Sequence, residues 1–171
     1  MKVTIKLDAD WEFEAEIPDD VAEKLKKKEE VKCTGYERVQ NGEQYFCANC
    51  ILELEDMEET GHGWDDQIYE CANYYTSEIV AENNARAEKL VRQLRRFAVE
   101  YREQDLDWTN SHQNKYYIYY DYDSNAICSA FNYKDCALGI IYFDSKEAAN
   151  LAINKYRDEL IWYFTEYKDS L

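Results

Sequence analysis

The sequence predicts an α+β fold: an N-terminal hairpin with a short helix, then two similar units in which a β-meander is packed by a long helix. Three observations predict it. Apolar residues alternate strictly at the N-terminus, an apolar stripe with helical spacing runs through the middle, and the middle of the chain resembles its end. We expect the segments 1–34, 35–106 and 107–171, which could share one compact domain.

The N-terminal segment has the period of two β-strands. Apolar residues alternate with polar ones over residues 3–7 and again over residues 11–17, with a short acidic turn between them. This pattern predicts a β-hairpin. Pro18 and the two aspartates after it favour the start of a short helix, which ends in the lysine run at residues 26–28.

The middle of the chain combines turn signals with a long helix. Aromatic residues flank an Asn41-Gly42 turn within residues 35–50, which predicts a second hairpin. The acidic residues that follow are interrupted by Gly61 and Gly63, so we expect a loop or an irregular hairpin there. After a cap at Thr76 or Ser77, apolar residues recur at three- and four-residue steps to about Arg102 and predict a long helix.

The end of the chain repeats this order. Residues 115–122 form an aromatic-rich strand pattern, and residues 126–131 and 139–143 predict further strands. Asp144 is placed to cap a final helix, with Glu147 completing a capping box.

An internal similarity underlies the prediction of two units. Residues 73–81 align without gaps on residues 141–149, and both stretches have an aromatic pair, a polar capping pair and small residues opening a helix. Upstream, Gln44-Tyr45-Phe46 resembles Lys115-Tyr116-Tyr117. The repeated unit is therefore expected to be a small β-meander followed by one helix.

These motifs resemble a known group of proteins. The run Tyr142–Ala149, followed by Ala152-Ile153 and Asp158–Leu160, resembles a module of uncharacterised accessory proteins from Gram-positive phages and prophages. Residues 73–98 resemble its companion half, so the resemblance covers about residues 70 to 171. It implies an origin in a mobile element, where small acidic proteins often inhibit host defence systems. Its motifs are structural and carry no catalytic residues.

The charge defines the expected partner. The formal net charge is −16, from 36 acidic and 20 basic residues, which repels nucleic acids and anionic membranes but attracts proteins that hold nucleic acid. Solubility is the commoner reason for an acidic surface. The local focus of charge predicts a partner-binding segment, whose residues are Glu53, Glu55, Asp56, Glu58, Glu59, Asp65, Asp66 and Glu70.

A basic stripe gives an alternative function. Arg86, Lys89, Arg92 and Arg96 recur on one face of the long helix and could hold a nucleotide or another anionic ligand. The competing interpretation is a solvated face whose intramolecular partner is the acidic segment at residues 53–70.

The cysteines give a second alternative, a zinc-stabilised structural protein. Cys47 and Cys50 form a C-x-x-C pair that could bind zinc together with Cys33 and Cys71, or with His62. The competing interpretation is that they are small buried residues. The sequence shows no targeting segment and no run of membrane-spanning length, so we expect free thiols or metal ligands rather than disulfides, and a cytoplasmic protein.

The chain shows no signature of a catalytic centre. It contains no G-x-S-x-G, no phosphate-binding glycine loop and no H-E-x-x-H. The leading hypothesis is a non-catalytic accessory protein of phage type that binds a host protein through its acidic segment. That partner would be a nucleic-acid-handling defence enzyme, such as a CRISPR effector or a restriction enzyme.

Overall fold

The computed structural model describes residues 2–8, 11–16, 18 and 34–167. The chain divides into two units, Met1–Thr34 and Gly35–Leu171, which are described separately. The elements are α-helices and antiparallel two-stranded sheets, so the α+β prediction is confirmed. No described helix combines the length and the apolar character needed to cross a membrane.

The first unit contains the predicted N-terminal hairpin. β1 (Lys2–Asp8) pairs with β2 (Trp11–Glu16), with Val3 opposite Ala15 and Ile5 opposite Phe13. The two alternating segments therefore pair with each other, as the sequence pattern predicted. The short helix predicted after Pro18 lies outside the described residues.

The second unit begins with a hairpin and a short helix. β3 (Gln44–Ala48) pairs with β4 (Leu54–Glu58), and the loop predicted around Gly61 connects β4 to α2 (Gly63–Glu70). The hairpin predicted around Asn41-Gly42 is wrong. That turn precedes β3, and the Gly42 amide donates to the Glu59 carbonyl, because the acidic strand β4 supplies the partner of β3.

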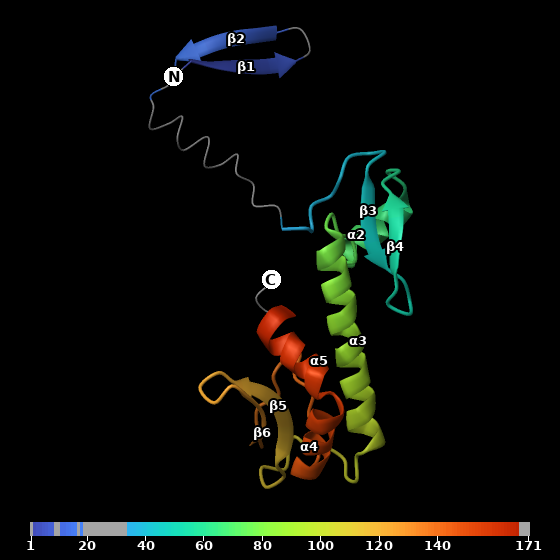
Figure 1. The fold of residues 1–171 in the computed structure, drawn as a ribbon, viewed down its shortest axis with the longest axis vertical. Helices are drawn as coiled ribbons and strands as arrows, with labels where there is room; N and C mark the ends of the chain where they lie inside the picture. The colour runs from blue at the N-terminus through green and yellow to red at the C-terminus, as the bar shows by residue number, and fades with distance from the viewer. Residues whose placement is uncertain (1, 9–10, 17, 19–33, 168–171) are drawn as a thin grey trace. The chain divides into compact units, whose positions relative to one another are not determined.

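A long helix joins the two halves of this unit. α3 (Glu78–Glu100) has Ser77 as its N-cap and Tyr101 as its C-cap, which confirms the predicted helix. Figure 1 shows the β3–β4 hairpin at one end of α3 and the β5–β6 hairpin with α4 towards the other. The apolar stripe of α3 forms part of the hydrophobic core of the second half, because Leu90, Leu94 and Phe97 pack with residues of α4 and α5.

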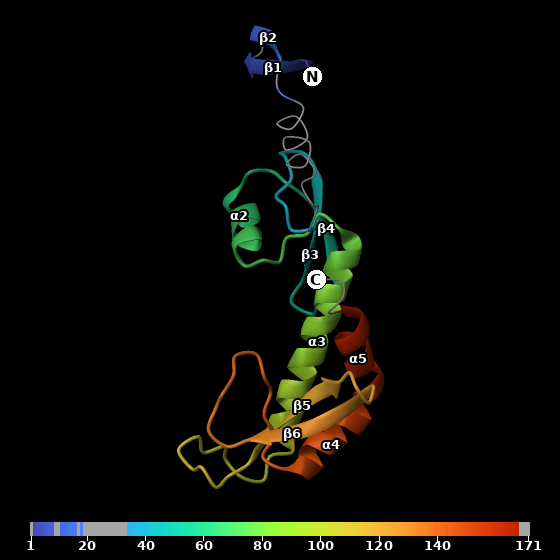
Figure 2. The ribbon, with the colours of Figure 1, turned by 90° about the vertical axis from the view of Figure 1, so that its left-hand side faces the viewer.

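The last part of the chain is a second hairpin followed by helices. β5 (Lys115–Asp121) pairs with β6 (Ala126–Asn132), as predicted, and the hairpin lies beside α4 (Lys146–Lys155) in Figure 2. α5 (Arg157–Trp162) and a π-helical turn, η1 (Tyr163–Tyr167), follow. Of the strand predicted at residues 139–143, only Phe143 forms a β-bridge.

The capping box predicted at Asp144 is wrong. Ser145 is the N-cap of α4, and its side chain accepts a hydrogen bond from the Ala148 amide at 3.2 Å. The buried Asp144 carboxylate instead accepts from the backbone amides of Glu103 and Gln104, at 2.7 and 3.0 Å. Asp144 thus holds the loop after α3 against the start of α4.

Each half of the second unit contains one isolated β-bridge, at the same place before a helix. Phe46 of β3 exchanges two backbone hydrogen bonds with Tyr75, and Tyr116 of β5 exchanges two with Phe143. Tyr75 and Phe143 each lie two residues before a helix N-cap. When the two bridges are superimposed, Phe46 corresponds to Tyr116 and Tyr45 corresponds to Lys115. This alignment is shifted by one residue from the one that the sequence suggested.

Candidate functional site

The first half of the second unit carries an uncompensated negative charge. Between Arg38 and Arg86 the chain contains no lysine or arginine, and these residues form β3, β4, α2 and the start of α3. The acidic residues of this stretch are Glu43, Glu53, Glu55, Asp56, Glu58, Glu59, Asp65, Asp66, Glu70, Glu78 and Glu82. Such a local excess of one sign creates a field that attracts basic surfaces.

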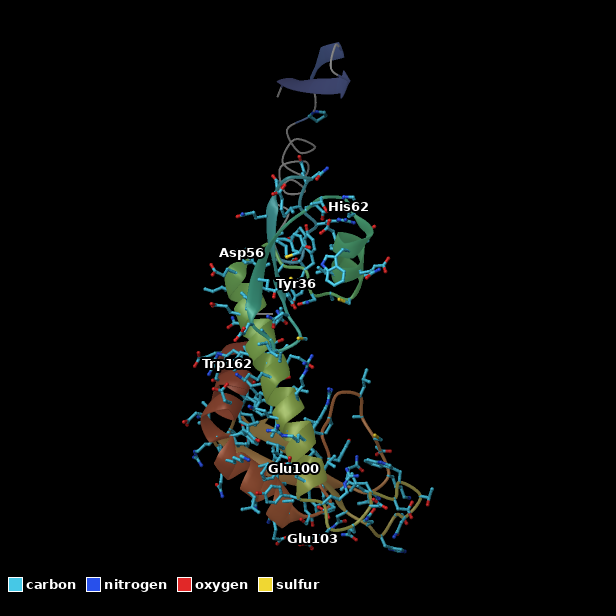
Figure 3. All side chains as sticks on the ribbon, turned by 90° about the vertical axis from the view of Figure 1, so that its right-hand side faces the viewer. Tyr36, Asp56, His62, Glu100, Glu103 and Trp162 are labelled. Carbon is cyan, nitrogen blue, oxygen red and sulfur yellow. The ribbon has the colours of Figure 1, made fainter. Side chains whose placement is uncertain are left out.

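The structure separates the predicted carboxylates into two groups. Glu59 and Asp65 are buried, with 3% and 2% of their surface exposed. The exposed group is Glu53, Glu55, Asp56, Glu58, Asp66 and Glu70. Figure 3 shows Asp56 of β4 and His62, the N-cap of α2, on opposite sides of this region.

Glu59 is held by an arginine fork. Arg38 donates to its two carboxylate oxygens at 2.9 and 3.0 Å, and the Tyr74 hydroxyl and the Gly61 amide donate at 2.9 and 3.0 Å. The Arg38 bonds in the first place, then the Tyr74 bond, lower the pKa of Glu59. Arg38 also pairs with the exposed Asp66 at 2.6 Å. The guanidinium charge nearest the acidic stretch is therefore neutralised internally.

Asp65 organises the loop before α2. The Thr60 hydroxyl donates to its carboxylate at 2.6 Å, and the Tyr45 hydroxyl and the amides of Thr60 and His62 donate at 2.9 to 3.2 Å. These bonds, led by that of the Thr60 hydroxyl, lower the pKa of Asp65 to about 2. The carboxylate therefore stays ionised and fixes both the loop and the first turn of the helix.

Two stacked tyrosines connect these carboxylates. The rings of Tyr45 and Tyr74 lie 3.8 Å apart at an angle of 12°, and both side chains are buried. Tyr45 donates to Asp65 and Tyr74 donates to Glu59. This network was not predicted from the sequence, and both carboxylates were expected on the partner surface. The available signal was Asp65 at the third position of a helix after a glycine-flanked residue, which is a capping position.

The described cysteines of the predicted zinc site lie around one pocket but differ in their exposure. Cys47 is buried, whereas Cys50 and Cys71 are exposed, and all three line one pocket of about 410 Å³ next to Trp64. Burial raises the pKa of the Cys47 thiol. Cys33 lies outside the described residues, and within them no cluster of three or more His, Cys, Asp or Glu side chains could hold a metal.

The zinc site stays a prediction that metal analysis can test. If zinc binds at Cys33, Cys47, Cys50 and Cys71, protein purified without chelator should contain about one equivalent, and the Cys50→Ser variant should contain much less. Equal metal content in both proteins would contradict this ligand set.

The basic stripe is occupied by neighbouring carboxylates. Arg86 forms a two-pronged pair with Glu159 at 2.8 and 3.0 Å and lies 3.9 Å from the centre of the Trp162 ring. The other ion pairs of this helix face are Arg92 with Glu88 and Arg96 with Glu100, while Lys89 is exposed. The expectation that residues 53–70 pair with these arginines is therefore wrong, since α3 itself and α5 supply their partners.

Comparisons with known proteins give no relative from which a role could be transferred. No protein-family description matches the chain, and no similar curated protein or solved structure was found. Function is therefore argued from the charges and contacts of the chain itself.

Proposed function

We propose that this chain is a non-catalytic accessory protein of phage or prophage type that binds and inhibits a host nucleic-acid-handling defence enzyme. The contact surface is the exposed carboxylates of β4 and α2, with those of the adjoining loops. The observation that carries the proposal is the absence of lysine and arginine between residues 38 and 86, together with the internal neutralisation of Arg38 by Glu59 and Asp66.

The chemistry of carboxylates supports this partner. A carboxylate offers two acceptor oxygens, which an arginine that binds phosphate can engage in the same two-pronged geometry. Complementary charge also speeds the encounter of the partners and makes binding sensitive to salt. The exposed Asp56, Glu58 and Glu70 offer this geometry to a basic surface that normally holds nucleic acid.

The buried network supports the surface from below. Glu59 and Asp65 fix the loop between β4 and α2 by accepting eight hydrogen bonds, whose donors are on Arg38, Tyr45, Thr60, Gly61, His62 and Tyr74. A preorganised surface loses less conformational entropy on binding than a flexible acidic tail. We therefore assign Glu59 and Asp65 a supporting role and leave the contact to the exposed residues.

The anionic-ligand alternative has less support. Arg86, Arg92 and Arg96 already pair with Glu159, Glu88 and Glu100. An anion on this stripe would have to displace those carboxylates, which lowers its net gain in free energy.

The test begins with affinity capture from nuclease-treated host lysate at low and moderate salt. The captured protein is then purified, and its binding to DNA or RNA is measured with and without this chain. We expect the chain to compete with nucleic acid, and the triple variant Asp56→Lys, Glu58→Lys, Glu70→Lys to lose at least tenfold in affinity, mainly through slower association.

A matched control variant separates the effect of the contact surface on binding from the effect of net charge. Glu103, Asp105 and Asp158 are also exposed, and replacing all three by lysine changes the net charge by the same amount. This control variant should bind within about threefold of the wild type, allowing for the long-range field. Equal losses in both triple variants would show that only net charge matters, and binding to a protein that does not handle nucleic acid would overturn the proposal.

A further inference from the structure

The two hairpins of the second unit each leave one strand at an edge. In the first hairpin β3 lies between β4 and the bridge residue Tyr75, so β4 is the outer strand. In the second, β5 lies between β6 and Phe143, so β6 is the outer strand. Among the described residues no strand pairs with the other side of β4 or of β6. An edge strand presents backbone groups that another strand can pair with.

The two edges differ in how they are protected. β4 has three carboxylates in five residues, Glu55, Asp56 and Glu58, and like charges on opposed strands repel. β6, with the sequence Ala-Ile-Cys-Ser-Ala-Phe-Asn, has no charged residue in seven. Every residue of β6 is at least partly exposed, and Phe131 is 52% exposed. β6 therefore lacks the charge that blocks pairing at the equivalent strand.

We infer that β6 is a self-association edge, which pairs antiparallel with β6 of a second copy of this chain. Antiparallel pairing centred on Ser129 uses all seven residues and keeps each side chain on its own face of the sheet. It places Ile127 opposite Phe131 of the second copy and Cys128 opposite Ala130. The result joins the two β5–β6 hairpins into one continuous antiparallel sheet.

Charge complementarity at the ends of β6 fits a second copy as the occupant. The net charge of −16 opposes self-association over most of the surface, and this repulsion is weaker at the uncharged β6. The pairing also brings the end of β6 that leads to Lys134 alongside the turn at Asp121–Asp123 of the second copy. Lys134 is the one basic residue between Lys115 and Lys146 in the sequence, so it meets an acidic turn rather than another lysine.

The faces of β6 are compatible with this arrangement. Ile127 packs against the core, and the Ser129 hydroxyl donates to Asn150 of α4 at 3.2 Å, so one face of β6 rests on the helices. Cys128 and Ala130 alternate to the other face, where small side chains allow a second strand to approach. Beside Asn150 on α4, Leu151 is 51% exposed and adds apolar surface on the helix side.

The experiment measures the oligomeric state and the register together. Sedimentation velocity of the full chain from 1 to 100 µM should show a concentration-dependent dimer. For the register, Cys33, Cys50, Cys71, Cys128 and Cys136 are replaced by serine, and Ser129→Cys is added at the centre of β6. Opposed residues of an antiparallel pair lie about 4.5–5.5 Å apart at Cα, within the range of about 4.4–6.8 Å that a disulfide spans.

The matched control uses the other edge. Asp56→Cys introduces a thiol at the centre of β4 in the same background. We expect mild oxidation to give a covalent dimer at least tenfold faster for Ser129→Cys than for Asp56→Cys. A chain that stays monomeric at 100 µM would overturn the inference, as would equal cross-linking rates. A dimer that persists when Ala130→Glu charges the edge would place the interface elsewhere and overturn it as well.

Discussion

The two halves of the second unit each contain one β-bridge two residues before a serine N-cap, but they bury different charged groups. The first half buries two carboxylates, Glu59 and Asp65, beneath a stacked tyrosine pair. At the position equivalent to Tyr45 the second half buries Lys115, whose ammonium donates to the carbonyls of Asn110 and Tyr133 at 2.9 and 3.4 Å. One backbone arrangement thus accepts buried groups of either sign, provided that each finds hydrogen-bond partners.

The difference extends to the surface. The outer strand of the first hairpin carries three carboxylates, and the outer strand of the second carries none. The first half therefore suits a basic partner and the second suits a neutral strand. Four predictions test this contrast, beginning with the largest expected effect.

Acid should destabilise the first half before the second. The pKa of Asp65 is about 2 in the folded chain, below its ordinary value of 3.8, and that of Glu59 is also lowered. The unfolded chain then binds protons first as the pH falls, so stability is fully present above about pH 5 and is lost between about pH 4 and pH 2. Thermal unfolding at pH 7, 4 and 3, with the amide signals of His62 and Ala148 as local reporters, measures the order of loss.

Two matched threonines separate this network from general acid effects. Thr60→Val removes the main donor to Asp65, so its melting temperature should fall at pH 7 and approach that of the wild type below about pH 3. Thr109 makes the same bond to the exposed Asp107, and Thr109→Val should change the melting temperature by a smaller amount at every pH. A Thr60→Val deficit that does not depend on pH would contradict the role of Asp65.

The equivalent buried residues Tyr45 and Lys115 should respond differently to loss of their polar ends. Tyr45→Phe deletes a hydrogen bond to a buried charge and should cost about 2 kcal/mol in unfolding free energy. Lys115→Met loses two hydrogen bonds but also relieves the desolvation of the ammonium, so the net cost should be about 1 kcal/mol. Urea denaturation of both variants measures the two costs, and a larger cost for Lys115→Met would reverse the comparison.

The two N-cap serines also differ. The Ser145 side chain accepts from the Ala148 amide, whereas the Ser77 side chain makes no cap hydrogen bond. Ser145→Ala should therefore lower the free energy of unfolding by about 1 kcal/mol, and Ser77→Ala should lower it by only a few tenths of a kcal/mol. Urea midpoints of the two variants decide the matter, and equal costs would show that the cap bond at Ser145 contributes little.

Backbone strain gives the smallest effect. Ala72, in the turn after α2, has φ +56°, and the amides of Asn73 and Ala72 donate to the carbonyls of Ile68 and Tyr69 in a turn that favours glycine. Ala72→Gly should stabilise the chain by about 0.5–1 kcal/mol. Asn125 has φ +51° in the second half, and Asn125→Gly should gain less because asparagine tolerates this conformation. A melting temperature lowered by Ala72→Gly would contradict the strain argument.

Local patterns in the sequence predicted the regular elements correctly where one period dominated. The alternation of β1 and β2, the aromatic-rich run of β5 and the apolar stripe of α3 each required only near neighbours along the chain. The prediction was wrong where a side chain hydrogen-bonds to a partner distant in the sequence instead of to a local one. Asp144 was expected to cap its own helix but binds the amides of Glu103 and Gln104, about 40 residues away.

The candidate surface shows the same division. The sequence by itself determined the acidic stretch between Arg38 and Arg86, because charge depends on composition alone. Only the tertiary structure decided that Glu59 and Asp65 are buried supports while Asp56, Glu58 and Glu70 are exposed, because burial depends on which distant side chains pack against each strand. It likewise decided that the neutral β6 is an outer strand, since strand order follows from pairing across the chain and not from any local pattern.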